Sequence, residues 1–347
     1  MKQMTLSAGS FERYSKTTRR AAFLADMNRV VPWKQLCALI KPFYPKAGNG
    51  RPPVGLERML RIYFIQNWFN LSDPAVEEAL YDSLSMREFV GIDLGREAAP
   101  DETTVCKFRH LLERHELGKQ LFEEVGRHLQ NRGMKVSTGT IVDATIISAP
   151  SSTKNRDKAR DPEMRQTRKG NQWHFVRYAH SAARNQRLSR CPAPPAGAGG
   201  MKAHIGVDSK TRLIHSVVAT PANEHDKHSI PDLLHGNERR VYGDSAYSSQ
   251  KELIAEAAPK ARDFTNQKGF RNRGLTEREQ EKNRRKSSVR AKVEHAFLII
   301  KRIFGFAKVC YRGMMKNGNR LFVVAALANL FMARHRLLRL PQGRCAR

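Results

Sequence analysis

The stretch TIVDATIIS, Thr140 to Ser148, places one carboxylate, Asp143, inside a run of β-branched and apolar residues. A run of this composition and length predicts a buried β-strand. Burying an ionised carboxylate is costly unless a cation, a metal ion or a hydrogen-bond network faces it. Asp143 is therefore either a strand-end residue that caps a turn or one member of a functional site.

A second acid, Asp244, follows another strand-like run. In RRVYGDSAYSS it comes directly after Val241, Tyr242 and Gly243, and a helical stretch begins at Gln250. Asp244 thus also lies at the end of a predicted strand. The chain therefore carries two acids at strand termini, and a third acid is needed to define a site.

The third acid, Glu294, lies in SVRAKVEHAFLIIKRIF, which has helical periodicity. Apolar residues at spacings of three and four form one stripe, which predicts a helix packed on the sheet. At about 100° per residue, Arg290, Glu294 and Lys301 fall within roughly 40° of one another on a neighbouring stripe. We expect this helix to point Glu294 along the sheet edge where the strands of Asp143 and Asp244 end.

Three carboxylates that converge from two strands and a helix suit Mg²⁺ or Mn²⁺, which prefer hard oxygen ligands and retain waters for a substrate phosphate. Two such ions can activate a water or a 3′-hydroxyl and stabilise the leaving oxygen of a phosphodiester. The arrangement predicts phosphoryl-transfer chemistry with two divalent ions. No nucleotide cofactor is expected, because the chain has no G-x4-G-K-[ST] motif.

Four ordered motifs, IVDATIIS, GMKAHIGVDS with LIHSVVATPANEHD, VYGDSAY and VRAKVEHAFLIIKRIFGF, resemble the catalytic motifs of bacterial insertion-sequence DDE transposases of the IS-five type. The resemblance runs from about Phe11 to Met332. It implies an α/β fold: a ribonuclease H-like mixed sheet with flanking helices, preceded by an all-α N-terminal domain. By position, it implies a catalytic and metal-binding triad of Asp143, Asp244 and Glu294.

The related signature R-x3-E-x6-K is met by Arg290, Glu294 and Lys301. Some relatives carry a tyrosine three residues before that arginine, where this chain has Ser287, so a role tied to that ring is not transferred. We expect Arg290 and Lys301 to contact DNA phosphates, because they share the stripe of Glu294. The alternative is that these charges only lie on a solvent-exposed face of the helix.

Composition indicates a polyanionic partner. Lys and Arg total 62 against 33 acidic residues, which gives a net charge of +29, and binding of phosphates by these cations releases condensed counterions. Five scattered cysteines without a C-x2-C pair favour a reducing cytoplasm over a disulfide framework. The apolar stretch LFVVAALANLFMA from Leu321 predicts a buried terminal helix and no membrane association.

We expect four regions along the chain: a basic arm over residues 1–20, a helical DNA-binding domain over 21–134, the catalytic domain over 135–335 and a basic tail over 336–347. In TTVCKFRHLLERHELGKQ, Lys107 and Arg109 lie near a helix start and are candidate DNA contacts, as in a recognition helix. The alternative is a bundle helix with a solvated basic face. In similar transposases the helical N-terminal region binds the ends of the element.

One segment departs from the family pattern. Relatives run from a QWHF-like sequence directly into GMKAHIGVD, whereas this chain inserts a basic, Pro/Ala/Gly-rich segment over residues 176–199. Its composition predicts a loop insertion. Lengthening a hairpin loop costs little, but if the strand must begin at Trp173, its pairing beside Asp143 is broken and the active site is misplaced.

The sequence thus predicts a DNA transposase, in the cytoplasm at the nucleoid, that cleaves the ends of its insertion sequence and joins the freed 3′-hydroxyls to target DNA. The expected partners are double-stranded DNA, as terminal inverted repeats and as target, and further copies of this chain. Two alternatives stay open: an inactive transposase-derived DNA-binding protein or repressor, favoured by the insertion, and a stand-alone metal nuclease of the same fold.

Overall fold

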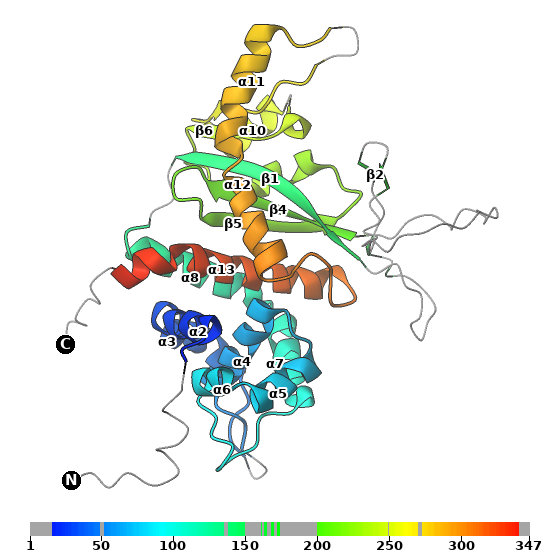
Figure 1. Ribbon diagram of the computed structural model, residues 1–347. Helices are drawn as coiled ribbons and strands as arrows, with labels where there is room; N and C mark the ends of the chain where they lie inside the picture. The colour runs from blue at the N-terminus through cyan, green and yellow to red at the C-terminus, as the bar shows by residue number, and fades with distance from the viewer. Residues whose placement is uncertain are drawn as a thin grey trace, which may run out of the picture.

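The computed structural model describes residues 16–48, 52–134, 138–149, 161, 163–164, 168–169, 172–173, 200–248, 250–269 and 273–339. A mixed sheet lies on a body of helices that contains the N-terminal half of the chain (Figure 1). The predicted basic arm lies mainly outside the described residues, and so do the insertion 176–199 and most of the predicted basic tail.

The central sheet has five strands in the order β5-β4-β1-β6-β7. The strands are β1 (Gly139–Ser148), β4 (Gly200–Asp208), β5 (Ile214–Pro221), β6 (Arg240–Tyr242) and β7 (Arg262–Asp263). β4 pairs antiparallel with both β1 and β5, whereas β6 pairs parallel to β1 and β7 pairs parallel to β6. This is the mixed sheet expected of a ribonuclease H-like domain.

The segment inserted between residues 176 and 199 leaves the sheet intact. A short hairpin of β2 (Arg168–Lys169) and β3 (Gln172–Trp173) precedes it. β4 begins directly after it at Gly200 and pairs with β1 from Ser148 to Thr140 without interruption. The strand that pairs beside Asp143 therefore does not need to begin at Trp173. The insertion does not interrupt the pairing of β4 with β1.

The two faces of β1 are covered by different helices. Ile141 and Ile147 face the main hydrophobic core, together with α12 (Val293–Leu298) and α13 (Met314–Arg339). Val142 belongs to a second, smaller cluster with residues of α9 (Ile230–Leu233) and α10 (Lys251–Ala257). The strict alternation follows from the two-residue period of a strand. It places Asp143 on the face of α12.

The N-terminal half is all helical, as predicted. Its elements are α2 (Arg19–Val30), α3 (Trp33–Ile40), η2 (Lys41–Phe43), α4 (Leu56–Phe69), α5 (Asp73–Asp82), α6 (Leu84–Val90), α7 (Glu102–Arg114) and α8 (Leu117–Asn131). α5 and α6 meet at Ser83, and Ser72 provides the N-cap of α5 by accepting a hydrogen bond from Ala75 N (3.3 Å). Asp73 is therefore free for a longer-range contact.

α13 joins the two halves. By length and composition alone this helix could cross a membrane, and most of its apolar window is buried inside the protein. It packs against α2, α8 and β5, so it is the buried core helix that the apolar stretch predicted. The approach to α8 is close: Gly118 N donates to Asn319 Oδ1 (2.8 Å), and a Cβ on Gly118 would overlap that amide. The main core therefore runs through both halves as one cluster.

The segment around Glu294 is not the single continuous helix that its periodicity predicts. α11 (Glu277–Arg290) begins with a capping box of Thr276 and Glu279 and ends at Arg290. Two i→i+3 bonds close the next turn, from Lys292 N to Val289 O and from Glu294 N to Ala291 O (both 3.2 Å). α12 follows and continues into a π-helical segment, η5 (Ile299–Ile303).

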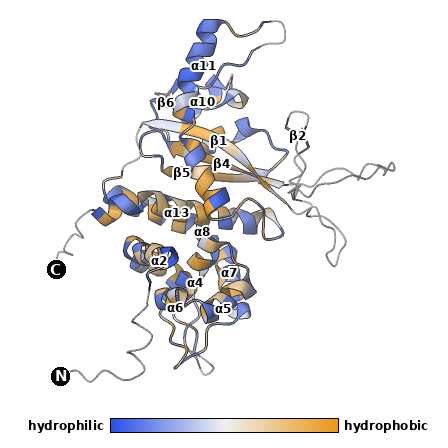
Figure 2. Cartoon of the chain, viewed as in Figure 1, coloured by the Kyte–Doolittle hydropathy of each residue, from blue (hydrophilic) through white to orange (hydrophobic). Residues whose placement is uncertain are grey.

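α11 has no buried residue. It projects away from the body of the molecule and is hydrophilic along its length (Figures 1 and 2). A helix that is polar on all sides draws little stability from packing. Its surface is instead presented to solvent or to a partner.

Candidate active site

Asp143 lies in the middle of β1, opposite Ile205 of β4. The residue is only 8% exposed. Its Oδ1 accepts a hydrogen bond from the adjacent Ala144 N (2.9 Å), and its Oδ2 accepts one from Arg290 Nη1 (3.0 Å). The buried carboxylate thus faces a cation, as its position in an apolar strand requires.

Asp244 follows the end of β6, which is the parallel neighbour of β1. Ile141 pairs with Tyr242 in this register. Asp143 and Asp244 each lie two residues beyond that pair, so the register continued along the chain brings them to the same level, near the spacing of about 4.8 Å between adjacent strands. The two acids also share the parity of Ile141 and Tyr242, both in the main core. Adjacent strands therefore deliver both carboxylates to one face of the sheet.

Local hydrogen bonding fixes the backbone at Asp244. Its Oδ1 accepts from Ala246 N (2.8 Å) and caps the short 3₁₀ turn η4 (Ser245–Tyr247). Side-chain capping of this kind is common for aspartate at a strand-to-helix junction. The residue is half-buried, so its second oxygen remains available beside the sheet.

Glu294 lies in the first turn of α12, which packs on β1. Its side chain is exposed. The turn that precedes it is tied to the far end of the sheet, where Lys292 Nζ donates to Ser209 O (2.8 Å). The third acid thus lies on a helix that packs on β1, with its side chain exposed, and its place in the site stays a prediction.

The pKa of Asp143 depends on its burial and on the charges of the other two acids. Burial raises the pKa of Asp143 to about 6; Arg290 opposes this shift, whereas the charges of Asp244 and Glu294 add to it. Ionising a buried carboxyl beside like charges is unfavourable unless a cation compensates. Among the causes of this shift, the Arg290 guanidinium lowers the pKa of Asp143, and the carboxylates of Asp244 and Glu294 raise it.

The acids do not form a ready cation-binding cluster in this conformation. Among the residues that the structure describes, no group of three His, Cys, Asp or Glu side chains is arranged to hold a metal ion. Arg290 takes up Oδ2 of Asp143, and Glu294 faces solvent. The donor chemistry suits a hard divalent ion, but ligation requires Arg290 to leave and Glu294 to turn inward.

The predicted stripe of Arg290, Glu294 and Lys301 does not survive intact, because the break after α11 and the π-turn of η5 change the rotation per residue. Arg290 contacts the acid itself rather than solvent. Lys301 is half-buried in η5 and makes contacts within the chain. A phosphate contact by either residue stays a prediction.

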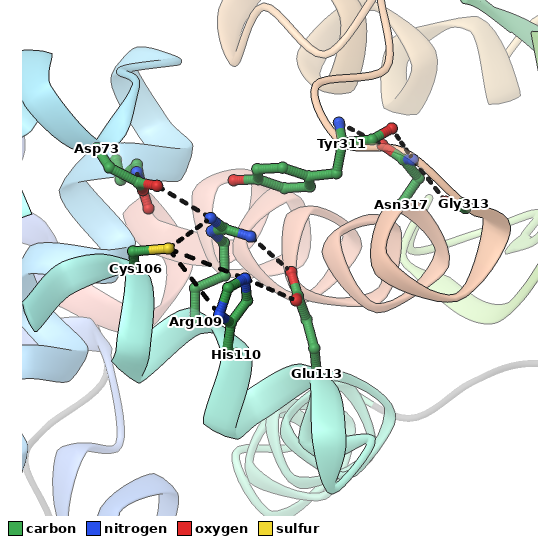
Figure 3. A network of polar contacts seen from close by, with 9 residues as sticks. Asp73, Cys106, Arg109, His110, Glu113, Tyr311, Gly313 and Asn317 are labelled. Atoms are coloured by element: carbon green, nitrogen blue, oxygen red, sulfur yellow. Dashed lines mark hydrogen bonds and ion pairs between the residues drawn. The ribbon is translucent and has the colours of Figure 1, made fainter. Parts of the chain in front are cut away.

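The two candidate contacts on α7 have different environments. Lys107 is exposed, as a DNA contact requires. Arg109 is 6% exposed, and its guanidinium binds Asp73 Oδ2 (2.9 Å) and Glu113 Oε1 (3.0 Å). It also lies over the ring of Tyr311 at 4.1 Å from the centroid (Figure 3). This burial does not support the predicted DNA contact for Arg109, which instead holds the N-terminal helices against the C-terminal half.

Sequence reasoning missed Tyr247. It is 1% exposed, and within the described part of the chain its buried hydroxyl has no hydrogen-bond partner. Burial raises its pKa, and the charges of Asp226, Asp143 and Asp244 raise it further. The hydroxyl therefore lies within electrostatic reach of the acids. Its only signal in the sequence is its position three residues after Asp244.

Asp226 is a further acid in the surroundings of Tyr247. It opens η3 (Asp226–Ser229), which contacts η4, and it forms an ion pair with Lys202 Nζ of β4 (2.9 Å). The neighbouring His225 caps η3 by accepting from Lys227 N (3.3 Å). The NEHD segment thus performs turn chemistry, as its residue types indicate, and also places one more acid near Tyr247.

Two family models match the chain. One, described as Transposase DDE domain, matches residues 135–330, and the other, described as Transposase domain (DUF772), matches residues 11–111. No solved structure matches the chain significantly. Neither model specifies an insertion-sequence type, so the IS-five assignment stays a prediction. The match of the DDE model over more than half of the chain shows that the protein belongs to the DDE transposase family, whose members are metal-dependent enzymes of DNA cleavage and strand transfer.

Proposed function

We propose that Asp143, Asp244 and Glu294 are the catalytic acids and metal ligands of this transposase. The enzyme would cleave the ends of its own insertion sequence and join the 3′-hydroxyls to target DNA. The observation that supports the proposal is the parallel pairing of β1 and β6, which ends at Ile141 and Tyr242, two residues before Asp143 and Asp244. α12 adds Glu294 over the same strand.

The ligands suit Mg²⁺ or Mn²⁺, because all three are hard oxygen donors from different elements. Bound as a pair, such ions would activate a water or 3′-hydroxyl and stabilise the leaving oxygen of the phosphodiester. The protein's own residues set the conditions for loading. Arg290 must release Oδ2 of Asp143, and DNA phosphate is a suitable alternative partner for its guanidinium.

DNA binding extends beyond the acids. α11 projects from the body with no buried residue and carries basic residues along its length. Together with Arg290, Lys301 and exposed Lys107, it would contact the backbone of double-stranded DNA. Residues 21–134 are proposed to recognise the terminal inverted repeats, and two ends handled together imply an assembly of several copies. Such an enzyme would act in the cytoplasm, at the nucleoid.

An inactive DNA-binding descendant is the second candidate. The feature that favours it is the insertion at 176–199. The uninterrupted pairing of β1 with β4 weighs against it, because the strand that carries Asp143 keeps its full hydrogen-bonded neighbour. A nuclease without strand transfer remains the third candidate, and a joining assay separates it.

The decisive experiment uses the purified full chain and a DNA fragment that carries the sequences flanking its gene. We expect nicking at the element ends that requires Mg²⁺ or Mn²⁺, followed by joining of the 3′-end to a target plasmid. The matched control is Asp143→Asn, which keeps side-chain size and removes the charge. Cleavage that persists unchanged in this variant would reject the assignment of the acids.

A further inference from the structure

A polar cleft lies beside the acids, on the side of β7 and α11. Its volume is about 350 Å³. Its walls come from the residue after η4, the start of α10, the chain that follows β7 and the side of α11. The acids of the active centre do not line this cleft, so it is a separate site.

Basic side chains dominate the lining. It contains Lys251, Lys268, Arg273 and Lys286, against Asp263 and Glu279. Both acids already accept hydrogen bonds from nearby backbone N–H groups. Asp263 Oδ1 accepts from Thr265 N (2.7 Å), and Glu279 completes the capping box of α11. Two of the cations, Lys251 and Lys268, are exposed and form no ion pair within the described residues. The cleft therefore offers more positive charge than its own acids neutralise.

The floor of the cleft holds further hydrogen-bonding groups. Lys286 Nζ donates to Thr265 O (2.8 Å), which uses one of the three hydrogens of an ammonium group. Asn266 Nδ2 donates to Ser287 Oγ (2.9 Å), but its Oδ1 is buried and has no partner among the residues described. Buried polar atoms are rarely left unsatisfied without a bound water or ligand.

The cleft is tied to the catalytic acids by two contacts. Asn266 N donates to Gly243 O (3.1 Å), and Gly243 directly precedes Asp244. The side chain of Asn266 bonds to α11 at Ser287, one turn before Arg290. The same residue thus connects the cleft wall to the acid of β6 and to the arginine that pairs with Asp143.

We propose that this cleft binds backbone phosphates of the DNA strand next to the reacting phosphodiester, with Lys251 and Lys268 as the contacts. This inference rests on the proposed function, because it takes the acids as the place of reaction. A DNA strand carries a phosphate about every 3.4 Å of helix axis, so a strand held at Asp244 must present further phosphates close to the adjoining cleft. Lysines suit them as point charges that tolerate any base sequence.

The test compares two double variants. Lys251→Gln/Lys268→Gln removes two exposed lysines of the cleft, and Lys210→Gln/Lys260→Gln removes two exposed lysines that neither line it nor lie on α11. DNA affinity is measured against salt in EDTA, so that no cleavage occurs. Loss of two phosphate contacts should lower the steepness of log K against log salt by about 1.8, whereas the control pair should change it much less.

Position on the DNA is tested with duplexes that carry one neutral methylphosphonate at successive phosphates around the cleavage point. At one or two phosphates next to it, neutralisation should weaken wild-type binding roughly tenfold and leave the cleft variant nearly unaffected, because the contact is already absent. A fold defect would not produce this position-specific pattern. Thermal unfolding should also be unchanged, since both lysines are exposed.

The two proposals fail in different ways. Equal slopes for the two double variants, or no phosphate whose neutralisation distinguishes wild type from the cleft variant, would overturn the cleft assignment alone. Cleavage that survives in Asp143→Asn would overturn the catalytic proposal, whereas the phosphate map would still report the cleft. Tight binding of a mononucleotide to wild type, without a methylphosphonate effect, would assign the cleft to a free nucleotide instead.

Discussion

Two arginine-carboxylate clusters of similar geometry have opposite consequences for this protein. Arg109 contacts Asp73 at 2.9 Å in the junction between the halves, and Arg290 contacts Asp143 at 3.0 Å at the sheet. The Arg109 side chain is 7% exposed, whereas that of Arg290 is 28% exposed. Distance alone therefore does not distinguish a structural pair from a functional one.

The surroundings make the distinction. Arg109 faces two carboxylates and the ring of Tyr311, and Asn317 holds the backbone of Tyr311 through a bond from Nδ2 to its carbonyl oxygen (2.7 Å; Figure 3). Arg320 adds a second cation over the same ring. In that cluster two cations, Arg109 and Arg320, lie near two carboxylates, Asp73 and Glu113, so the charges balance. The cluster is largely buried. Arg290 pairs with Asp143, whose pKa is also raised by the charges of Asp244 and Glu294, and its side chain is 28% exposed.

The largest expected effect follows from Asp143→Asn. Loss of an outer partner of a metal ligand typically costs 10- to 100-fold, so loss of a ligand itself should lower cleavage by at least about 100-fold. Measurement is by metal-dependent nicking of the element ends. An activity within a few-fold of wild type would remove Asp143 from the reaction.

The same variant should not destabilise the metal-free protein at pH 8. Since the pKa of Asp143 is raised to about 6, its contribution to stability is fully present below its ordinary pKa and is lost as pH rises through 6. Asparagine carries no such loss. Thermal unfolding at pH 8 should therefore give an equal or higher midpoint for Asp143→Asn, and a marked decrease would contradict the raised pKa.

Arg109→Met, in contrast, should lower the free energy of unfolding. It leaves Asp73 and Glu113 without their cation in a buried junction, which should cost about 3–5 kcal/mol of unfolding free energy. Arg96→Met is the matched control, because its pair with Asp93 is on the surface, where such pairs contribute about 0–1 kcal/mol. Urea denaturation measures both. Equal effects would mean that the Arg109 cluster does not stabilise the junction.

Acid should weaken the sheet half through two buried histidines. Burial lowers the pKa of His204 to about 4 and that of His215 to about 3. Both stay neutral in the folded chain, so stability is present above their ordinary pKa near 6.5 and is lost as pH falls from 6.5 toward 4. His204→Gln should reduce this loss, by at most about 3 kcal/mol. If the free energy of unfolding varies with pH in the same way for the variant and the wild type, this prediction about His204 is wrong.

The smallest expected effect concerns Arg290→Gln. Without the guanidinium, Oδ2 of Asp143 has no charged competitor for a divalent ion, so Mn²⁺ should raise the melting temperature more than in wild type. DNA affinity in EDTA should fall severalfold, because a phosphate contact is lost. Arg239→Gln, an exposed residue that lies outside α11, is the control. A smaller Mn²⁺ shift in Arg290→Gln would contradict competition between the arginine and the ion.

Local chemistry made much of the architecture predictable. The β-branched run around Asp143 forms β1, and Thr276 with Glu279 begins α11 as a capping box. Patterns of this kind act over a few residues, so a sequence displays them directly. The break at Ala291 and the π-turn of η5 were not predictable. They depend on how the helix meets the sheet and α13, which periodicity does not encode.

By itself, the sequence determined the class of protein, the basic surface, the mixed sheet with its helical N-terminal half, and the three acids with their elements. Only the tertiary structure decided the partners of the charges. Arg109 finds Asp73 and Tyr311 across the junction, and Arg290 finds Asp143 from 147 residues away. The physical reason is that an arginine's role depends on its burial and on the net charge around it. Both are properties of the packed chain, and neither is visible in local sequence.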